Sequence, residues 1–430
     1  MVGSCRKIRL VIVLALLVVA GCGEHAGDEA AKTYRHAMDG APSSLDPAQA
    51  ASIYANFIAL NLYDTLYRYK YLARPYELTP NLADAMPEVS ADGLTLTIRI
   101  KQGVHFIDDP AFEGGRGREV KAQDFIYSIK RHFDPAMRAQ GAWLWQQRIA
   151  GLDAWKANGS DYGVEVPGLR ALDDYTIQVS LTRPFPQFVH TLAQGYAAIV
   201  PREAVETYGQ AFSNHPVGSG PFKLISRDGV RALLARNPGF RKEPFDLEHE
   251  GFDAGRHAGL GLEELQGRSP PLVDQLQFEF ITEDAARWSA FTAGEVQFIK
   301  VPVSQFEAVL ERRDPVTLDA KYHGRYHFEA VPDAGFIYTN FNMADPVIGH
   351  HPDPAQDERN RALRCAMVKA FDWDKRNEIF FYDIGRVFPG IIPPVVPEFE
   401  PDGDAAYIRR DLPGAKALLE NSGWTPDTLP

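Results

Sequence analysis

The sequence predicts a mixed α/β protein with more than one lobe. Segments in which apolar and polar residues alternate are typical of half-buried strands, and segments with helical spacing lie between them. With 430 residues the chain exceeds one ordinary hydrophobic core, so we expect two or three lobes. The expected strands are residues 93–100, 175–181, 272–281 and 335–342, and the expected helices include 122–133 and 357–371.

Residues 241–271 interrupt this pattern. They are rich in Gly, Pro, His and acidic residues and show little periodicity. This composition favours a surface insertion or a long loop between the regular elements.

The first residues have the features of an export signal. Three basic residues precede an apolar run at 10–20, which is shorter than the ~20 residues that a membrane-spanning helix needs. We therefore expect a signal peptide at 1–21 and a flexible tether at 22–32. The segment VAGC, which ends at Cys22, resembles the lipobox of bacterial lipoproteins. This resemblance implies that Cys22 becomes the first mature residue and carries acyl chains, whereas the alternative is an uncleaved anchor with an incidental cysteine.

Charge and cysteine content exclude several classes of function. Removal of the signal peptide takes away three basic and no acidic side chains, which changes the formal charge from −12 to −15. Such an acidic protein is not expected to bind nucleic acid or anionic membrane surfaces. Besides the lipid site only Cys365 remains, so we expect no internal disulfide, and the helical spacing around Cys365 favours a small helix residue over a nucleophile.

The segment His215–Leu224 (HPVGSGPFKL) has the glycines of a phosphate loop or a nucleophile elbow, but its spacing excludes both. A phosphate loop needs Lys and Ser or Thr at a helix start, whereas Pro221 follows the glycines and removes an amide donor. An elbow needs glycine two residues to either side of Ser219, and those positions hold Val and Pro. We expect Gly218 and Gly220 to permit backbone conformations closed to other residues, ahead of a strand that starts with FKLIS.

No metal site, cofactor or enzymatic activity is expected. Residues 349–353 (GHHPD) bring two imidazoles and a carboxylate close in sequence, but neighbouring side chains of an extended chain point to opposite faces. A solvated loop in which Asp353 or Asp357 caps the next helix is the favoured interpretation. The run from His249 to His257 lacks the H-E-x-x-H spacing that brings two imidazoles onto one helical face.

Eight stretches, in order along the chain, together resemble the family 5 extracellular solute-binding proteins. This class contains the dipeptide- and oligopeptide-binding proteins of ABC importers. The stretches are 43–47 (SSLDP), 62–66 (LYDTL), 78–83 (LTPNLA), 92–106 (DGLTLTIRIKQGVHF), 121–128 (KAQDFIYS), 216–222 (PVGSGPF), 236–240 (RNPGF) and 363–372 (LRCAMVKAFD).

The resemblance implies a type II (cluster C) periplasmic binding protein fold with three lobes. The ligand would be enclosed by hinge closure in a cleft between lobes I and III. Lobe I would comprise 33–66 and 167–275, lobe II 67–166, and lobe III 276–430. The family normally continues beyond the end of this sequence, so lobe III is expected to be incomplete and to lack the segment with the aspartate that pairs with a ligand's α-amine.

The resemblance also names candidate cleft residues. Aromatic residues make up 11% of the chain, and those outside the core could line a cleft because rings offer contact area at low entropic cost. Motif positions or their neighbourhood suggest Ser52, Ile53, Tyr54, Tyr127, Phe240, Phe298, Asn342 and Arg386. Asn360 and Gln297 stand where the family has Asp, which leaves the charge pattern of the site open.

The expected function is that of a membrane-anchored lipoprotein on the periplasmic side of the cell envelope. It would capture peptides as a monomer and deliver them to the membrane permease of an ABC importer, without covalent chemistry. The alternatives are another solute, such as a nickel chelate, haem or an oligosaccharide, an envelope hydrolase or lyase, and a shortened copy that binds only a partner protein.

Overall fold

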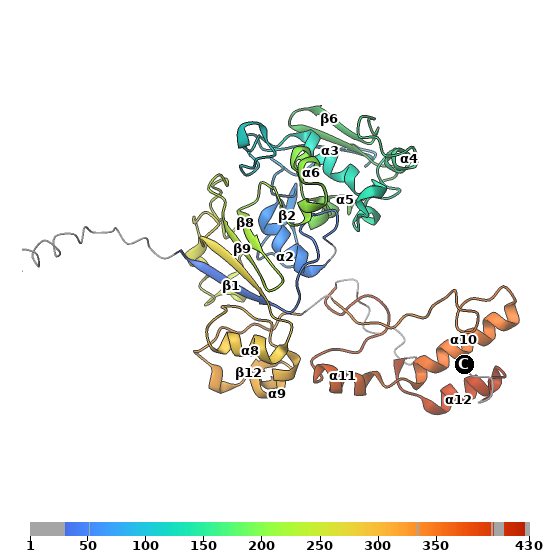
Figure 1. Ribbon diagram of the computed structural model, residues 1–430. Helices are drawn as coiled ribbons and strands as arrows, with labels where there is room; N and C mark the ends of the chain where they lie inside the picture. The colour runs from blue at the N-terminus through green and yellow to red at the C-terminus, as the bar shows by residue number, and fades with distance from the viewer. Residues whose placement is uncertain (1–30, 51, 333–334, 397–398, 400–407, 426–430) are drawn as a thin grey trace, which may run out of the picture. The chain divides into compact units, whose positions relative to one another are not determined.

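The computed structural model describes residues 31–50, 52–332, 335–396, 399 and 408–425 (Figure 1). The expected signal peptide, Cys22 and nearly all of the tether lie outside these residues. The chain divides into two compact units, one ending at Ile299 and one starting at Lys300. Within the described part, no helix has both the length and the apolar character to cross a membrane.

The first sheet of the N-terminal unit joins residues 33–38 to much later segments. Its order is β1-β10-β9-β8, with β1 parallel to β10 and the other neighbours antiparallel. The expected strands at 272–281 and after Pro221 are thereby confirmed. The four strands are β1 (Thr33–Met38), β8 (Phe222–Arg227), β9 (Arg231–Arg236) and β10 (Gln275–Phe280).

The second sheet of this unit is antiparallel, in the order β4-β5-β7-β6. The expected strands at 93–100 and 175–181 form β5 and β7 and pair with each other. The strands are β4 (Glu88–Val89), β5 (Thr95–Arg99), β6 (Leu169–Asp173) and β7 (Thr176–Ser180), and a separate hairpin is formed by β2 (Tyr67–Tyr69) and β3 (Leu78–Pro80).

Two of the expected lobe boundaries cut through these sheets. The boundary between residues 166 and 167 separates β6 and β7 from β5, although β7 pairs with β5 over five residues. The boundary between residues 275 and 276 separates most of β10 from β1, its parallel neighbour. Ladder hydrogen bonds thus join strands on the two sides of each of these boundaries. The division into three lobes stays a prediction.

Helices cover both sheets, with α2 against β8 and α3 against β6 (Figure 1). Helix α2 starts where Ser52 Oγ accepts a hydrogen bond from the Ala55 amide at 3.1 Å. The expected helix at 122–133 is α3, and Asp124 caps it by accepting from the Lys121 amide at 2.8 Å. The helices of this unit are α2 (Ile53–Leu62), α3 (Ala122–Arg131), α4 (Leu152–Ala157), α5 (Phe188–Thr191), α6 (Arg202–Tyr208), α7 (Ala254–His257) and α8 (Asp284–Thr292).

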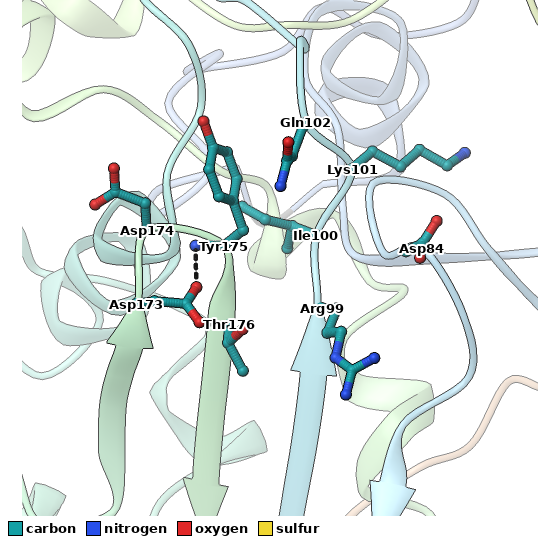
Figure 2. Close-up of a pocket in the computed structure, with 9 residues that line it drawn as sticks. All are labelled: Asp84, Arg99, Ile100, Lys101, Gln102, Asp173, Asp174, Tyr175 and Thr176. Atoms are coloured by element: carbon teal, nitrogen blue, oxygen red, sulfur yellow. Dashed lines mark hydrogen bonds between the residues drawn. The ribbon is translucent and has the colours of Figure 1, made fainter.

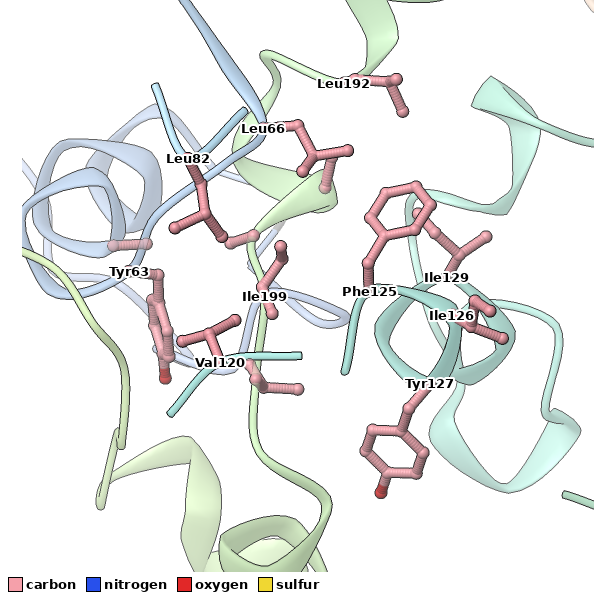
Figure 3. Packing of buried hydrophobic residues seen from close by; sticks show 14 of the residues in the cluster. Tyr63, Leu66, Leu82, Val120, Phe125, Ile126, Tyr127, Ile129, Leu192 and Ile199 are labelled. Atoms are coloured by element: carbon pink, nitrogen blue, oxygen red, sulfur yellow. The ribbon is translucent and has the colours of Figure 1, made fainter. Parts of the chain in front are cut away.

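One continuous hydrophobic core fills the space between these elements (Figure 3). Phe125 and Ile129 of α3 belong to the same cluster as Leu66, Leu82 and Ile199, and each of these side chains is almost fully buried. Burial of a side chain of this size contributes about 1.5–3 kcal/mol relative to exposure. Six of the eight segments that carry the family motifs, all except 236–240 and 363–372, therefore contribute to one core.

The glycines of the 218–220 segment are needed for a close approach of two backbones. Neither Gly218 nor Gly220 has a left-handed φ, so the expected conformational role is wrong. A Cβ at Gly218 would lie 2.2 Å from the Leu62 carbonyl oxygen, and one at Gly220 would lie 2.6 Å from the Leu62 carbonyl carbon. The Gly220 amide donates to the Leu62 oxygen at 3.0 Å, so this segment fixes the end of α2.

A buried ion pair lies beside this approach. Arg241 donates to both carboxylate oxygens of Asp64, at 2.8 and 2.9 Å, and the two side chains are 14% and 3% exposed. Ser219 Oγ donates to Asp64 at 2.8 Å, and Arg241 also donates to Asn81 Oδ1 at 2.7 Å. Burial acts to lower the pKa of Arg241, but Asp64 raises it above its ordinary value. The network joins the segments around residues 64, 81, 219 and 241.

A second buried ion pair joins the S-L-D-P segment to α3. Arg131 Nη1 and Nη2 donate to the Asp46 carboxylate at 2.9 and 2.6 Å, and both side chains are buried. Asp46 also accepts from the Ala48 amide at 3.0 Å. The start of the segment that leads into α2 is therefore fixed to α3.

The expected loop at 241–271 contains two short helical turns, α7 and a 3-10 helix (Leu262–Leu265). Glu250 within it is buried, accepts from both terminal nitrogens of Arg68, and accepts from the Tyr71 amide at 2.8 Å. The loop is therefore held against the β2 hairpin by its own buried carboxylate.

The C-terminal unit is mainly helical in its described part. The expected helix at 357–371 starts earlier, as α10, and Asp353 caps it by accepting from the Ala355 amide at 3.0 Å. Asn360 is fully buried and donates to the carbonyl oxygens of Pro346 and Gly349, both at 3.0 Å. The elements are α9 (Phe306–Val309), β11 (Leu310–Arg313), β12 (Val316–Leu318), α10 (Pro354–Ala370), α11 (Trp373–Phe381) and α12 (Leu412–Asn421).

The expected strand at 335–342 is not formed. These residues have no strand geometry, and Phe336, Ile337 and Tyr338 are exposed. Alternation of apolar and polar residues produces a strand only where a second strand pairs with it, and no described segment does so here.

We predict that Gly220→Ala destabilises the protein by about 1–3 kcal/mol, because the added Cβ meets main-chain atoms that cannot move aside easily. Gly229→Ala is the matched control, since a Cβ there meets nothing within 4 Å and its φ is not left-handed. Urea unfolding of the full-length chain measures both. Equal losses in the two variants would contradict this explanation of the glycines.

We predict that Arg241→Met lowers the free energy of unfolding by about 3–5 kcal/mol, because it leaves the buried Asp64 carboxylate without its counter-charge. Arg236→Met removes a pair with Asp274 of similar length, 3.0 Å, whose side chains are nearly half exposed, and is expected to cost no more than about 1 kcal/mol. The same unfolding measurement compares them. A smaller loss in Arg241→Met than in Arg236→Met would show that the network does not stabilise the fold.

Candidate functional site

An apolar helix face is exposed on α2. Ile53, Phe57 and Leu60 are 63%, 47% and 48% exposed, and their spacing places them on one side of the helix. The other faces of α2 are anchored, since Ala55, Ile58, Ala59 and Leu62 are buried. A row of large apolar side chains without a cover is typical of a surface that binds something.

The imidazole of His36 on β1 continues this row. Its ring centroid lies 5.6 Å from that of Phe57 and 4.8 Å from that of Phe298, on which it stacks. Burial lowers the pKa of His36, so the ring is neutral at pH 7 and acts as an aromatic surface.

The backbone around Phe298 is fixed to β1. The Ala37 amide donates to the Phe298 oxygen at 3.3 Å, and the side chain of Gln297 accepts from the Arg35 amide at 2.7 Å. Gln297, which stands where the family has Asp, thus has a structural hydrogen bond. Phe298 remains 47% exposed beside His36.

Next to this row, the side chain of Tyr54 packs against the residues that follow β1. Its ring lies against Gly40, where an added Cβ would come within 2.5 Å of a ring carbon. Burial and the nearby Asp39 carboxylate raise the pKa of Tyr54, so the phenol stays protonated at pH 7. In the described part of the chain, the amide and carbonyl groups of Gly40 and Ala41 have no hydrogen-bond partner.

These groups form one continuous surface at the end of β1 and on the first half of α2, which we call the β1–α2 surface. It combines aromatic and aliphatic side chains, one carboxylate and unpaired main-chain groups, so it can bind a ligand that has both apolar parts and hydrogen-bonding groups. Its members are His36, Asp39, Gly40, Ala41, Ile53, Tyr54, Phe57 and Phe298.

The structure brings three of the predicted residues, Ile53, Tyr54 and Phe298, onto this surface, and Ser52 caps the helix that carries two of them. Tyr127 belongs to the hydrophobic core, where burial raises its pKa to about 12 (Figure 3). The ring of Phe240 lies beneath the Arg241 guanidinium, 4.6 Å from its carbon.

The remaining two predicted residues lie in the C-terminal unit. Asn342 Oδ1 accepts from the Ala344 amide at 3.1 Å, and the Arg386 guanidinium lies 5.4 Å from the Phe399 ring centroid. Their role in a site stays a prediction.

Sequence reasoning missed His36, Asp39 and Phe57. Phe57 could have been found from the i, i+4, i+7 spacing of apolar residues in the segment after Ser52. His36 and Asp39 gave no such signal, because only the pairing of β1 and the packing of α2 bring them to the surface.

A surface hollow of about 770 Å³ lies elsewhere in this unit, at the end of β5 and the turn between β6 and β7 (Figure 2). Its polar groups serve the local structure: Asp173 accepts from the Tyr175 amide and the Thr176 hydroxyl, each at 2.8 Å, and Lys101 pairs with Glu243 at 2.5 Å. These hydrogen bonds lower the pKa of Asp173. We therefore place the candidate site on the β1–α2 surface.

The described residues contain no group of three or more His, Cys, Asp or Glu side chains placed to hold a metal ion. In the GHHPD segment, His350 Nδ1 lies 3.3 Å from Asp357, and His351 Nδ1 accepts from the Asp353 amide at 3.1 Å. These imidazoles take part in the cap of α10.

Known proteins with similar sequences are bacterial binding proteins. The di/tripeptide-binding protein 2 of Pseudomonas aeruginosa is 25% identical over 424 residues, which covers 96% of this chain and 68% of that protein. The dipeptide-binding protein of Escherichia coli is 24% identical over 400 residues, covering 91% and 64%. The glutathione-binding protein GsiB of Pectobacterium atrosepticum is 26% identical over 279 residues, covering 65% and 44%. The chain thus spans about half to two thirds of the length of these relatives.

Solved structures show the same fold. The murein tripeptide binding protein MppA of Escherichia coli superposes with a TM-score of 0.67 at 19% identity, over 93% of this chain and 68% of that one. The DppA protein of Helicobacter pylori in complex with the peptide STSA superposes with a TM-score of 0.66 at 20% identity, over 91% of this chain and 66% of that one. The predicted type II periplasmic binding protein fold is therefore confirmed.

The family comparison covers most of the sequence. Residues 77–429 match the family described as bacterial extracellular solute-binding proteins, family 5 Middle. The chain therefore belongs to the family 5 bacterial extracellular solute-binding proteins, as the eight sequence motifs predict.

Proposed function

We propose that this protein captures short peptides in the cell envelope and delivers them to the permease of an ABC importer. The observation that carries the proposal is the β1–α2 surface, where exposed apolar side chains of α2 lie beside main-chain groups that have no partner. A peptide offers the matching chemistry, because its backbone groups can pair with those of Gly40 and Ala41 regardless of its sequence.

Side chains of the peptide would contact the aromatic part of this surface. The ring centroid of His36 lies 5.6 Å from that of Phe57 and 4.8 Å from that of Phe298. Rings accept varied apolar groups, so this contact favours affinity over strict side-chain selection. The relatives named for dipeptides, di- and tripeptides and glutathione support the same ligand class.

Membrane anchoring belongs to the same proposal. The lipobox-like segment before Cys22 and the apolar run before it support a lipoprotein, and a lipid anchor would hold the binding protein near its permease. Asn342 and Arg386 are kept as candidate ligand contacts from the C-terminal unit.

We predict that Phe57→Ala lowers the affinity for a bound di- or tripeptide by about tenfold, because it removes an aromatic contact at the centre of the surface. The control is Leu172→Ala, which removes a similarly exposed apolar side chain from β6. Peptides would first be identified by the rise in melting temperature of the full-length protein, and their dissociation constants then measured by calorimetry.

Two outcomes would contradict the proposal. If no di- or tripeptide raises the melting temperature while an oligosaccharide, haem or a nickel chelate does, the ligand class is wrong. If peptides bind and Phe57→Ala and Leu172→Ala have equal affinities, the site lies elsewhere.

We predict that Cys22→Ser abolishes incorporation of labelled palmitate and moves the protein from the detergent phase to the aqueous phase in phase-partition assays. Cys365→Ser is the matched control and should keep both the label and the detergent partitioning, because Cys365 lies on the exposed side of α10. Labelled Cys22→Ser protein would show that the anchor is attached at another residue.

A further inference from the structure

Two buried polar atoms near the end of α2 have no hydrogen-bond partner among the described residues. One is the hydroxyl oxygen Oη of Tyr63, the residue that follows α2, and the other is the guanidinium nitrogen Nε of Arg131, the last residue of α3. Both residues are only 2% exposed, so bulk solvent does not reach them. Because burial of a polar group without a hydrogen bond is costly, such atoms are normally satisfied by protein or by an ordered water.

The two atoms belong to one site in the hydrophobic core. The ring of Phe212 borders both residues, since its centroid lies 5.7 Å from the guanidinium carbon of Arg131 and 6.5 Å from the ring centroid of Tyr63. The charges of Arg131 and of its partner Asp46 both act on the Tyr63 hydroxyl. Burial raises the pKa of Tyr63 well above its ordinary value, so the phenol is protonated at pH 7 and can donate as well as accept.

The terminal nitrogens of Arg131 are already engaged. Nη1 and Nη2 donate to the Asp46 carboxylate at 2.9 and 2.6 Å, and Nη2 also donates to Met137 Sδ at 3.6 Å. The Nε–H group can only donate, and it has no direct hydrogen bond to the Tyr63 hydroxyl. A small molecule between the two atoms is the arrangement that satisfies both of them.

The charges of the site select a neutral occupant. The Asp46 carboxylate opposes an anion here, and the Arg131 guanidinium opposes a cation. A water molecule can accept from Arg131 Nε and from the Tyr63 hydroxyl, and it keeps two donors of its own. Asp46 can accept one of these, because its carboxylate has about four lone-pair positions and uses three, for the two Arg131 nitrogens and the Ala48 amide. Buried waters typically make about three hydrogen bonds.

We infer that a buried water molecule bridges Tyr63 Oη and Arg131 Nε. This water links the end of α2 by hydrogen bonds to the Asp46–Arg131 pair. Asp64, the residue after Tyr63, pairs with Arg241, so the end of α2 is then linked to both buried ion pairs of the N-terminal unit. The inference concerns the support of the helix and does not depend on the proposed function.

The direct test is a crystal structure of the full-length protein at a resolution that shows ordered waters. The expected result is one water at about 2.5–3.2 Å from both Tyr63 Oη and Arg131 Nε. The inference is overturned if the two atoms form a hydrogen bond directly with each other, or if no water density lies between them.

The substitution Tyr63→Phe tests the same water in solution, because it removes the hydroxyl and keeps the ring. If the hydroxyl bonds to a water, the variant loses a hydrogen bond, and its melting temperature should fall by about 1–3 °C. Tyr67→Phe is the matched control and should fall by a similar amount, since Tyr67 is also buried and its hydroxyl donates directly to the Ala85 oxygen at 3.3 Å. An unchanged or higher melting temperature in Tyr63→Phe would show that its hydroxyl has no partner, which would overturn the inference.

Discussion

The buried ion pair between Asp64 and Arg241 is the interaction on which the candidate site depends most. It places two opposite charges in a nearly dry environment, and such a pair is tolerated only when geometry and further hydrogen bonds satisfy both partners. Ser219 and Asn81 supply those hydrogen bonds. Asp64 lies just after the end of α2, and Gly220 packs against Leu62 in the last turn of this helix. The network therefore determines where α2 ends.

The consequence for function lies at the other end of the same helix. With its last turn fixed by the network and its first turn capped by Ser52, α2 presents Phe57 at a defined place beside β1. The Asp46–Arg131 pair holds the segment that leads into the helix. Rigid elements thus position the exposed apolar side chains, which is the arrangement that allows a surface to bind without first having to order itself.

The sequence alone predicted those parts of the account that depend on local pattern or on motifs. Helix α3, helix α10 and strands β5, β7 and β10 follow from periodicity, and the motif after S-L-D-P led to Ile53 and Tyr54. The division into three lobes stays a prediction, because strand pairing is non-local and joins segments on both sides of two of its boundaries. The strand expected at 335–342 failed because alternation cannot supply a partner strand. Asp39 and His36 went unnoticed because single polar residues near a strand end give no signal until the fold brings a helix against them.

Two departures from the family pattern have a structural explanation. The side chain of Gln297 accepts a hydrogen bond from the backbone of β1. Asn360 donates hydrogen bonds to two carbonyl oxygens, and an ionised aspartate has no donor with which to do so. Neither residue therefore needs a role in the charge pattern of the ligand site. The roles of Asn342 and Arg386 depend on where the C-terminal unit meets a ligand, and local pattern carries no information about that.

The central claim is that a peptide lies on the β1–α2 surface, and photo-crosslinking tests it most directly. A tripeptide with p-benzoylphenylalanine at its second position would be irradiated with the full-length protein, and the labelled residues identified by mass spectrometry. The account predicts label on α2 (Ile53–Leu62) and around Phe298, which excess unlabelled peptide removes. The account would be contradicted if the label that unlabelled peptide removes were confined to residues 99–102 and 173–176, around the hollow of Figure 2.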